Sequence, residues 1–138
     1  MTSRRFTAQR GYSLIELLIV VVIAGVLATL AYPSYAAQLN KGRRTDAISA
    51  LYQVQQAQER WRANHSRYTD DLALLGLSAA VPDRYRLSIS TASADGYTAT
   101  ATAQWPDGAC TTLSLGLQGG QVVHGASGSA SPRLCWNR

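Results

Sequence analysis

An uninterrupted apolar run constrains this chain more than any other feature. From Leu17 to Leu39 there is no Asp, Glu, Lys or Arg, and Glu16 stands directly before the run. Residues 12–39 are long enough for a membrane-spanning helix, which needs about 20 apolar residues. A carboxylate at the bilayer centre costs about 3 kcal/mol, so Glu16 calls for a function or a cationic partner. Its helical neighbours at positions 12, 13, 19 and 20 supply no cationic side chain.

A secretory signal peptide is the alternative interpretation of this run. It would combine the basic start with the apolar stretch and be cut after Ala28, Ala31 or Ala36. The run is longer than such a segment needs, and Glu16 would have no purpose inside it. The positive charges on its two sides are equal in number and do not set its orientation. Only the cysteines, which come later in the chain, favour a C-terminal part outside the cytoplasm.

One helix is expected from about Tyr12 to Asn64, and two residues are expected to interrupt or weaken it. Pro33 removes a hydrogen bond and clashes with the preceding turn, at a cost of about 3 kcal/mol, and Gly25 is a milder weak point. Beyond Asn40, apolar positions recur every three or four residues up to about Asn64, which predicts an amphipathic helix with one buried face. The residues expected on that face are Ile48, Leu51, Val54, Gln58 and Trp61.

The remaining chain alternates with period two and predicts an antiparallel sheet. Strands are expected at 85–90, 97–105 and 113–117, with a weaker fourth at 121–124, separated by Asp-Gly and Gly-Gly turn signals. Small alanines on one face of the second strand suit a helix lying close across the sheet. The expected fold is therefore α+β, with a long N-terminal helix whose amphipathic half packs on an antiparallel head. The residues after 124 are expected to be loop.

Two cysteines, Cys110 and Cys135, lie beyond the apolar run. Outside the cytoplasm, a disulfide is the default prediction for such a pair, with about 3 kcal/mol of stabilisation. A zinc site is disfavoured, because the cysteines, His65 and His124 show none of the close paired spacings that zinc ligands use. We therefore expect a disulfide and no cofactor or metal.

No catalytic motif stands out in the sequence. Residues 125–128 fall short of a nucleophile elbow, and there is no phosphate loop, HExxH motif or dinucleotide fingerprint. His65 and His124 are isolated from workable partners and are expected at a helix end and on a strand surface. The three tryptophans are expected to cover the core or the disulfide. The chain is therefore expected not to be an enzyme.

The start of the chain combines Gly11, at the end of a short basic leader, with the aromatic Tyr12, Ser13 and Glu16. With these residues it resembles the N-terminus of type IV pilins. The stretches "AYPSY", "KGRRTDA" and "ALYQVQQAQERWRANHSRYT" and the late Cys-Trp resemble the type IVa subclass, particularly its PilE-type minor pilins. The family usually has Phe at the position of Tyr12 and Thr at that of Ser13.

This resemblance implies a processing and assembly pathway. An inner-membrane prepilin peptidase would remove residues 1–11 by cutting between Gly11 and Tyr12 and would methylate the new amine. Residues 12–39 would form the transmembrane and assembly helix, and residues 40–138 a periplasmic head. That head would comprise helix 40–64, loop 65–83, sheet 84–124 and the disulfide-bounded loop 110–135. The assembly platform would then move the subunit from the inner membrane into an extracellular pilus, where Glu16 meets a neighbouring subunit, in support of adhesion and twitching motility.

Two other functions remain open at this point. Lys41, Arg43 and Arg44 form the densest basic cluster, which suits anionic lipid headgroups or, in a competence-type minor pilin, DNA. From Lys41 onward there are ten Lys/Arg and seven Asp/Glu, so the head can neutralise few phosphates. A type II secretion pseudopilin would share the N-terminal motif, but the cysteine loop is more typical of pilins.

Overall fold

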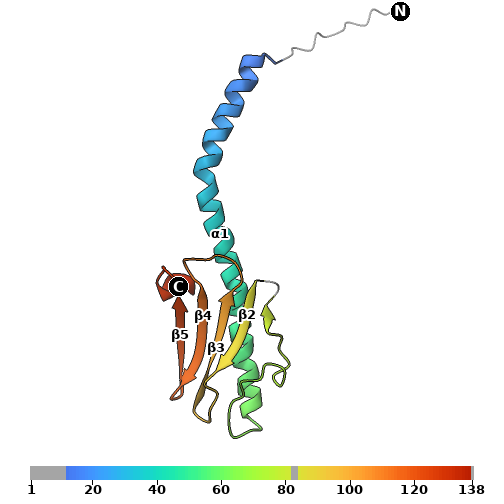
Figure 1. The fold of residues 1–138 in the computed structure, drawn as a ribbon, viewed down its shortest axis with the longest axis vertical. Helices are drawn as coiled ribbons and strands as arrows, with labels where there is room; N and C mark the ends of the chain where they lie inside the picture. Colours follow the sequence, from blue (N-terminus) through green and yellow to red (C-terminus); the bar gives the residue numbers. More distant parts are fainter. Residues whose placement is uncertain (1–11, 82–83, 138) are drawn as a thin grey trace, which may run out of the picture. The chain divides into compact units, whose positions relative to one another are not determined.

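The computed structural model describes residues 12–81 and 84–137. The chain divides into two compact units, one up to Ala37 and one from Gln38 on, and each is described by itself. Helix α1, Leu14–Arg62, contributes residues to both (Figure 1).

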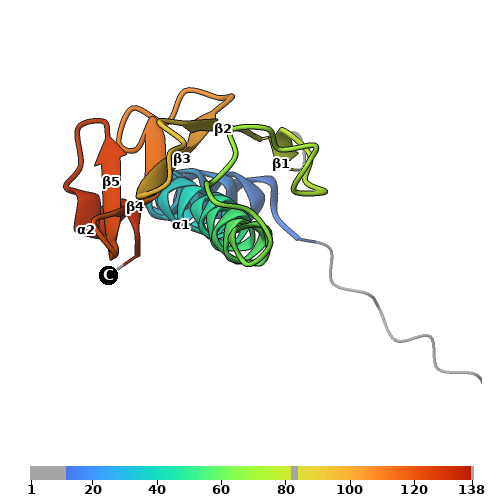
Figure 2. The ribbon, with the colours of Figure 1, turned by 90° about the horizontal axis from the view of Figure 1, so that it is seen from below.

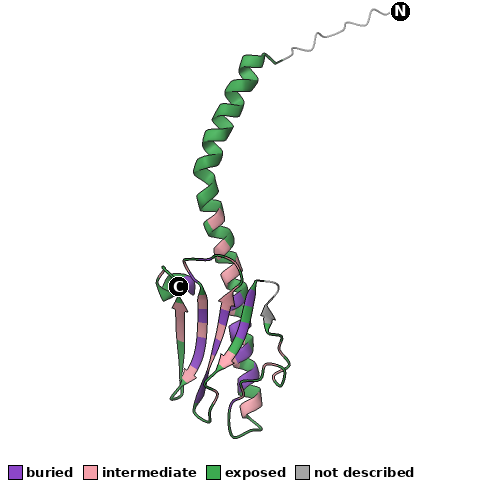
Figure 3. Ribbon diagram, in the orientation of Figure 1, coloured by how far each residue is buried: buried purple, intermediate pink, exposed green. Residues whose placement is uncertain are grey.

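The first unit is an apolar helix with no protein surface to cover it. The backbone N–H groups of Glu16 and Leu17 donate to the carbonyl oxygen of Ser13 at 3.1 and 3.2 Å and begin the helix. Every described residue from 12 to 35 is exposed (Figure 3). By length and composition this stretch could cross a membrane. Its apolar surface requires lipid or other protein chains.

The expected helix breaks at Gly25 and Pro33 are not observed. Helix α1 continues through both residues without interruption. Proline removes only its own N–H from the ladder, and the hydrogen bonds before and after it remain available. A Cβ placed on Gly25 would meet nothing within 4 Å, so no packing constraint selects glycine there. In an apolar environment, unsatisfied backbone groups are so costly that the helix is retained across such weak points.

In the second unit, one face of α1 packs against the sheet. Its buried residues recur at helical spacing and are Ala47, Ala50, Leu51, Val54, Ala57 and Gln58. Ile48 and Trp61, which were expected on this face, are only partly buried. Figure 2 shows the sheet lying over one side of α1. The small alanines on both surfaces allow this close approach.

The sheet is an antiparallel meander with the strand order β1-β2-β3-β4-β5. Its strands are β1 Ala80–Val81, β2 Tyr85–Ser90, β3 Gly96–Ala103, β4 Thr112–Gln118 and β5 Gln121–Ser127. The inward residues of β2, β3 and β4 alternate as predicted, with Tyr85, Tyr97, Leu113 and Leu115 almost fully buried. Gly119 and Gly120 both have positive φ, +56° and +79°, as a two-residue type I′ hairpin turn requires.

The C-terminal segment differs from the expected loop. Strand β5 continues to Ser127, and residues Pro132–Cys135 form a short helix, α2. Pairing with β4 extends the strand, since Gly125 and Ala126 lie opposite Ser114 and Leu113. The side-chain hydroxyls of Thr112 and Ser127 are also hydrogen-bonded at 2.6 Å. The Gly- and Ser-rich composition favoured a loop, and strand pairing overrides it. The two-residue β1 was also not predicted.

Candidate functional site

The candidate processing and assembly residues lie at the start of α1. Gly11 lies outside the described residues, whereas Tyr12 is 78% exposed and Glu16 is in the first helical turn. Negative charge in that turn interacts favourably with the helix dipole. Within the described part of the chain, no ion pair includes Glu16.

The basic cluster does not present three free cations. Arg44 donates two hydrogen bonds to the Asp107 carboxylate, from Nε at 2.9 Å and from an Nη at 2.8 Å. The Arg43 guanidinium carbon lies 5.4 Å from the centre of the Trp105 ring, over its face. Lys41 is exposed. The expectation that Arg44 contacts DNA or lipid is corrected, because its charge is neutralised within the head.

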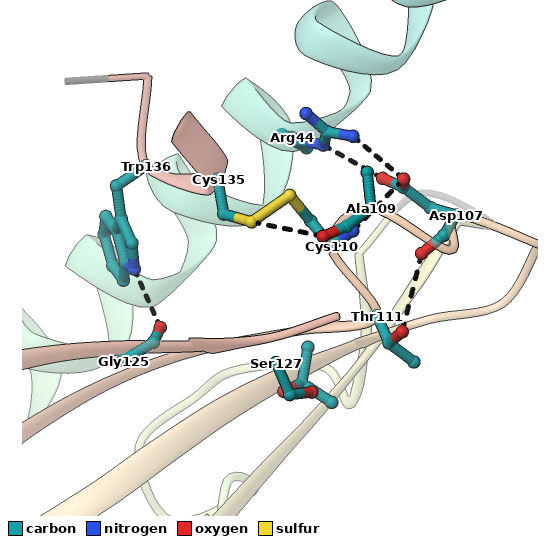
Figure 4. Close-up of a disulfide and its surroundings, with 10 residues drawn as sticks. Arg44, Asp107, Ala109, Cys110, Thr111, Gly125, Ser127, Cys135 and Trp136 are labelled. Atoms are coloured by element: carbon teal, nitrogen blue, oxygen red, sulfur yellow. Dashed lines mark hydrogen bonds and ion pairs between the residues drawn. A yellow bond between two sulfur atoms is a disulfide. The ribbon is translucent and has the colours of Figure 1, made fainter. Parts of the chain in front are cut away.

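The predicted disulfide between Cys110 and Cys135 is present, with a Cα–Cα distance of 5.6 Å (Figure 4). Both cysteines are fully buried. Asp107, on the same loop as Cys110, accepts a hydrogen bond from the Cys110 backbone N–H at 3.3 Å. The Trp136 Nε1–H donates to the carbonyl oxygen of Gly125 at 2.8 Å. The disulfide, the Arg44–Asp107 pair and Trp136 together hold the C-terminal segment against β5 and α1.

An aromatic cluster joins this segment to the helix. The ring of His124 packs edge to face on Trp136, with centroids 4.5 Å apart, and Tyr52 lies 6.2 Å from Trp136. His124, Pro132, Arg133 and Trp136 line a pocket of about 320 Å³. From the sequence, His124 was predicted to be isolated on a strand surface. Its partners Tyr52 and Trp136 could not be predicted, because they are distant from it in the chain.

A second cluster closes the C-terminal end of α1. The buried Gln58 amide donates to the Thr69 carbonyl oxygen at 2.5 Å and accepts from the Thr69 N–H at 3.2 Å. The ring of His65 stacks on that of Trp61, with centroids 3.6 Å apart. The expected place of His65 at a helix end is correct, and its aromatic partner was not foreseen.

Two buried tyrosines complete the core beneath these clusters. Burial, and then the nearby Asp107 carboxylate, raises the pKa of Tyr85 to about 12. Burial, and then Glu59, raises the pKa of Tyr97 above its ordinary value. Neither hydroxyl has a hydrogen-bond partner in the described structure. These groups serve packing, and among the described residues no cluster of His, Cys, Asp and Glu could hold a metal ion.

Comparisons with known proteins agree with this architecture. Residues 33–114 match the family model described as "Type IV minor pilin ComP, DNA uptake sequence receptor", and residues 6–32 match the prokaryotic N-terminal methylation motif. The type IV major pilin PilA of Myxococcus xanthus is 32% identical over 93 residues, 67% of this chain and 42% of PilA. The type II secretion system core protein G of Klebsiella pneumoniae is 36% identical over 73 residues, 52% of each chain. PilE1 of Neisseria gonorrhoeae is 30% identical over 77 residues, 56% of this chain and 47% of PilE1.

A long N-terminal helix packed on an antiparallel sheet, with an N-terminal methylation motif, is consistent with the type IV pilin fold. The matched model covers more than half of the 138 residues, and the chain belongs to the type IV minor pilin ComP family. It spans less than half the length of PilA. The apolar helix fits a membrane anchor.

Proposed function

We propose that this chain is a minor subunit of a type IV pilus, cut between Gly11 and Tyr12 by a prepilin peptidase and methylated on the new amine. The observation that carries the proposal is the uncovered apolar surface of residues 12–35. Lipid covers this surface before assembly, and the same helices of neighbouring subunits cover it in the filament. The assembly platform transfers the subunit between these two environments.

The head lies on the periplasmic side of the inner membrane before assembly. The buried disulfide supports this orientation, because disulfides form and persist in oxidising compartments. The assembled filament then carries the head outside the cell, where it supports adhesion and twitching motility.

Intact-mass analysis of the membrane-inserted protein tests the processing step. We expect loss of residues 1–11 and one added methyl group on Tyr12, and Gly11→Leu should leave an uncut precursor. A mature N-terminus at Thr29, Tyr32 or Ala37 would identify an ordinary signal peptide and contradict the proposal.

The role of Glu16 follows from cleavage. Removing residues 1–11 creates an α-amine on Tyr12, which remains protonated when monomethylated. This amine is four residues before Glu16 in the same chain and just before the start of α1, where it can neutralise the charge. In a filament, the carboxylate instead meets the Tyr12 amine of a neighbouring subunit and sets the axial register. An unpaired charge in an apolar bundle is costly, so pairing selects one register over others.

Sheared filaments distinguish the two pairings. Glu16→Gln should be cleaved and stable in the membrane yet incorporate poorly, whereas Leu17→Ile should incorporate normally. Normal incorporation of Glu16→Gln would show that the pair between subunits is not required.

DNA capture is a second candidate function, favoured by the description of the family model as a DNA uptake sequence receptor. Six basic side chains of the head are exposed, and no described ion pair involves them: Lys41, Arg60, Arg67, Arg84, Arg86 and Arg133. We propose that a subset of these cations contacts phosphate groups. Arg44 is excluded from the subset because its guanidinium forms an ion pair with Asp107.

The test is a titration of the detergent-solubilised full chain with duplex DNA at two salt concentrations. Binding should weaken with salt, and replacing one contacting Arg by Gln should reduce the salt slope by about 1. The exposed, uncharged Gln53→Ala variant serves as the control. Absence of binding at low salt would remove this candidate and leave the filament role intact.

A type II secretion pseudopilin is the remaining alternative, since core protein G is among the similar proteins. Recovery of the protein in sheared surface filaments supports the pilus. Loss of protein secretion on deletion, without any change in filaments, would support the secretion machinery.

A further inference from the structure

A pocket of about 350 Å³, lined by both polar and apolar residues, lies between the tips of two hairpins. One side comes from the β2–β3 connection, with Thr91 and Asp95, and the other from the β4–β5 turn, with Gln118 and Gly119. Because both tips belong to paired strands, the sheet fixes the distance between them. The pocket is thus built on rigid elements and is separate from the disulfide loop and the end of α1.

Backbone without side chains forms part of its lining. A Cβ added to Gly96 would collide with the carbonyl group of Leu117, so the close approach of β3 and β4 requires glycine there. Gly119 has a φ of +56°, which also favours glycine. A ligand entering the pocket can therefore approach main-chain atoms directly.

The β2–β3 connection is held in a costly conformation. Thr91 has a φ of +53°, which is an outlier for a β-branched residue. Its Oγ1–H lies 2.8 Å from the Ser90 carbonyl oxygen and 3.3 Å from the Thr98 hydroxyl. The Ser93 hydroxyl accepts hydrogen bonds from the N–H groups of Asp95 and Gly96 at 3.2 and 3.1 Å. These bonds use the loop's own hydroxyls and hold the Asp95 backbone in place.

Two polar side chains of the pocket remain uncommitted. In the described structure neither the Asp95 carboxylate nor the Gln118 carboxamide makes a hydrogen bond or an ion pair, and both residues are exposed. The carboxylate accepts hydrogen bonds only, whereas the carboxamide both donates and accepts. Together they match a ligand that carries several adjacent hydroxyl groups.

The lining chemistry argues against two other ligand classes, anions and calcium ions. The pocket contains no Lys, Arg or His, and its one carboxylate repels anions such as phosphate. A single carboxylate is also too little for Ca²⁺, which takes six to eight oxygen ligands. Its volume is at the lower end of the range of about 300–1,000 Å³ for small-molecule sites.

We propose that this pocket binds a neutral sugar ring through a pair of adjacent hydroxyl groups. Asp95 accepts a hydrogen bond from each of the two hydroxyls, and Gln118 bonds a third hydroxyl or the ring oxygen. The site is independent of DNA capture, because none of the basic residues proposed for DNA lines it.

Saturation-transfer NMR tests the proposal on the full chain in a detergent without sugar headgroups. The probes are the methyl glycosides of glucose, galactose and mannose at millimolar concentration, together with a neutral oligosaccharide of each sugar. We expect transfer to the ring protons of at least one probe. Tighter binding of the oligosaccharide would assign the site to glycan chains, and equal binding would assign it to single sugars.

Asp95→Asn and Gln118→Ala should each weaken binding, the first by roughly tenfold or more, as expected for a hydrogen bond to a charged group. Asp46→Asn removes an exposed carboxylate outside the pocket and should change nothing. All three positions are exposed, so the variants should fold, which circular dichroism checks. Absence of transfer to every probe, or transfer that both pocket variants leave unchanged, would overturn the proposal.

Discussion

The Arg44 guanidinium donates two hydrogen bonds to the Asp107 carboxylate, although 63 residues separate them in the sequence. The Asp107 side chain is 2% exposed and that of Arg44 is 12% exposed. The pair joins helix α1 to the loop that begins the disulfide-bounded segment. Because the pair is buried, removing either charge would leave the other buried without a partner.

Asp107→Ala should lower the free energy of unfolding by about 3–5 kcal/mol, because it leaves the Arg44 charge buried and unpaired. Chemical unfolding followed by circular dichroism measures the loss. Adding Arg44→Met to this variant should recover part of the stability. A loss below about 1 kcal/mol for Asp107→Ala would show that solvent reaches the pair as it does a surface salt bridge.

The second unit should fold alone. A fragment beginning at Gln38 keeps the buried face of α1 and the whole sheet. It lacks most of the exposed apolar helix and should be a soluble monomer that unfolds cooperatively. Size-exclusion chromatography with light scattering and urea unfolding provide the test, and aggregation or a non-cooperative transition would contradict it.

Removing the disulfide should loosen the C-terminal segment. The cysteines are 25 residues apart, and closing a loop of that length stabilises a protein by about 3 kcal/mol. Cys135→Ser should therefore lower the free energy of unfolding by about 2–4 kcal/mol. In the native protein neither cysteine should react with a thiol reagent. The double variant, with both cysteines replaced by Ser, separates the bond from the effect of one unpaired thiol.

Substitution of Gln58 should lower the free energy of unfolding far more than substitution of its exposed neighbour Gln56. Gln58→Leu leaves the N–H and C=O of Thr69 without their side-chain partner, at about 1–3 kcal/mol for each buried group. Gln56→Leu, at an exposed position of the same helix, is the matched control and should change stability by less than about 0.5 kcal/mol. Equal effects of the two substitutions would rule out the Gln58–Thr69 contact as the cause.

Alkaline pH should destabilise the head through its buried tyrosines. Burial raises the pKa of Tyr85 to about 12 and also raises that of Tyr97. Above pH 10 the unfolded chain loses these protons while the folded chain retains them, so stability falls as pH rises from about 10 to 12. The slope is at most about 1.4 kcal/mol per pH unit for each tyrosine.

Tyr85→Phe isolates the contribution of Tyr85 to the loss of stability at alkaline pH. The Tyr85 hydroxyl has no partner in the described structure, so its removal should change stability near pH 7 by less than about 1 kcal/mol. Urea unfolding at pH 8, 10 and 11 should show a shallower alkaline loss in this variant. An unchanged slope would mean that other groups cause the loss.

The sequence was informative wherever structure depends on local periodicity. The alternation around Tyr85, Tyr97 and Leu113 predicted the inward faces of three strands, and the spacing of Leu51, Val54 and Gln58 predicted the buried helix face. The disulfide also followed from the count of two cysteines, both beyond the apolar run. Each of these predictions uses only neighbouring residues or a count.

Features that depend on residues far apart in the chain could not be predicted from the sequence. Nothing near Arg44 in the chain indicates Asp107, so a buried ion pair was taken for a free cation. The Gly- and Ser-rich residues after His124 became strand only because β4 supplies a partner. Pro33 was given too much weight, because its cost of about 3 kcal/mol is small beside that of exposing backbone in an apolar medium.

The meander order of the sheet has a consequence for the sequence of folding events. Each strand pairs with its neighbour along the chain, so hairpins can form one after another as the polypeptide emerges. In contrast, the disulfide of Cys110 and the hydrogen bond to the Gly125 carbonyl oxygen cannot form until Cys135 and Trp136 are present. These two residues come after all five strands. The last step is therefore closure of the C-terminal segment, and an oxidant acting earlier finds Cys110 without its partner.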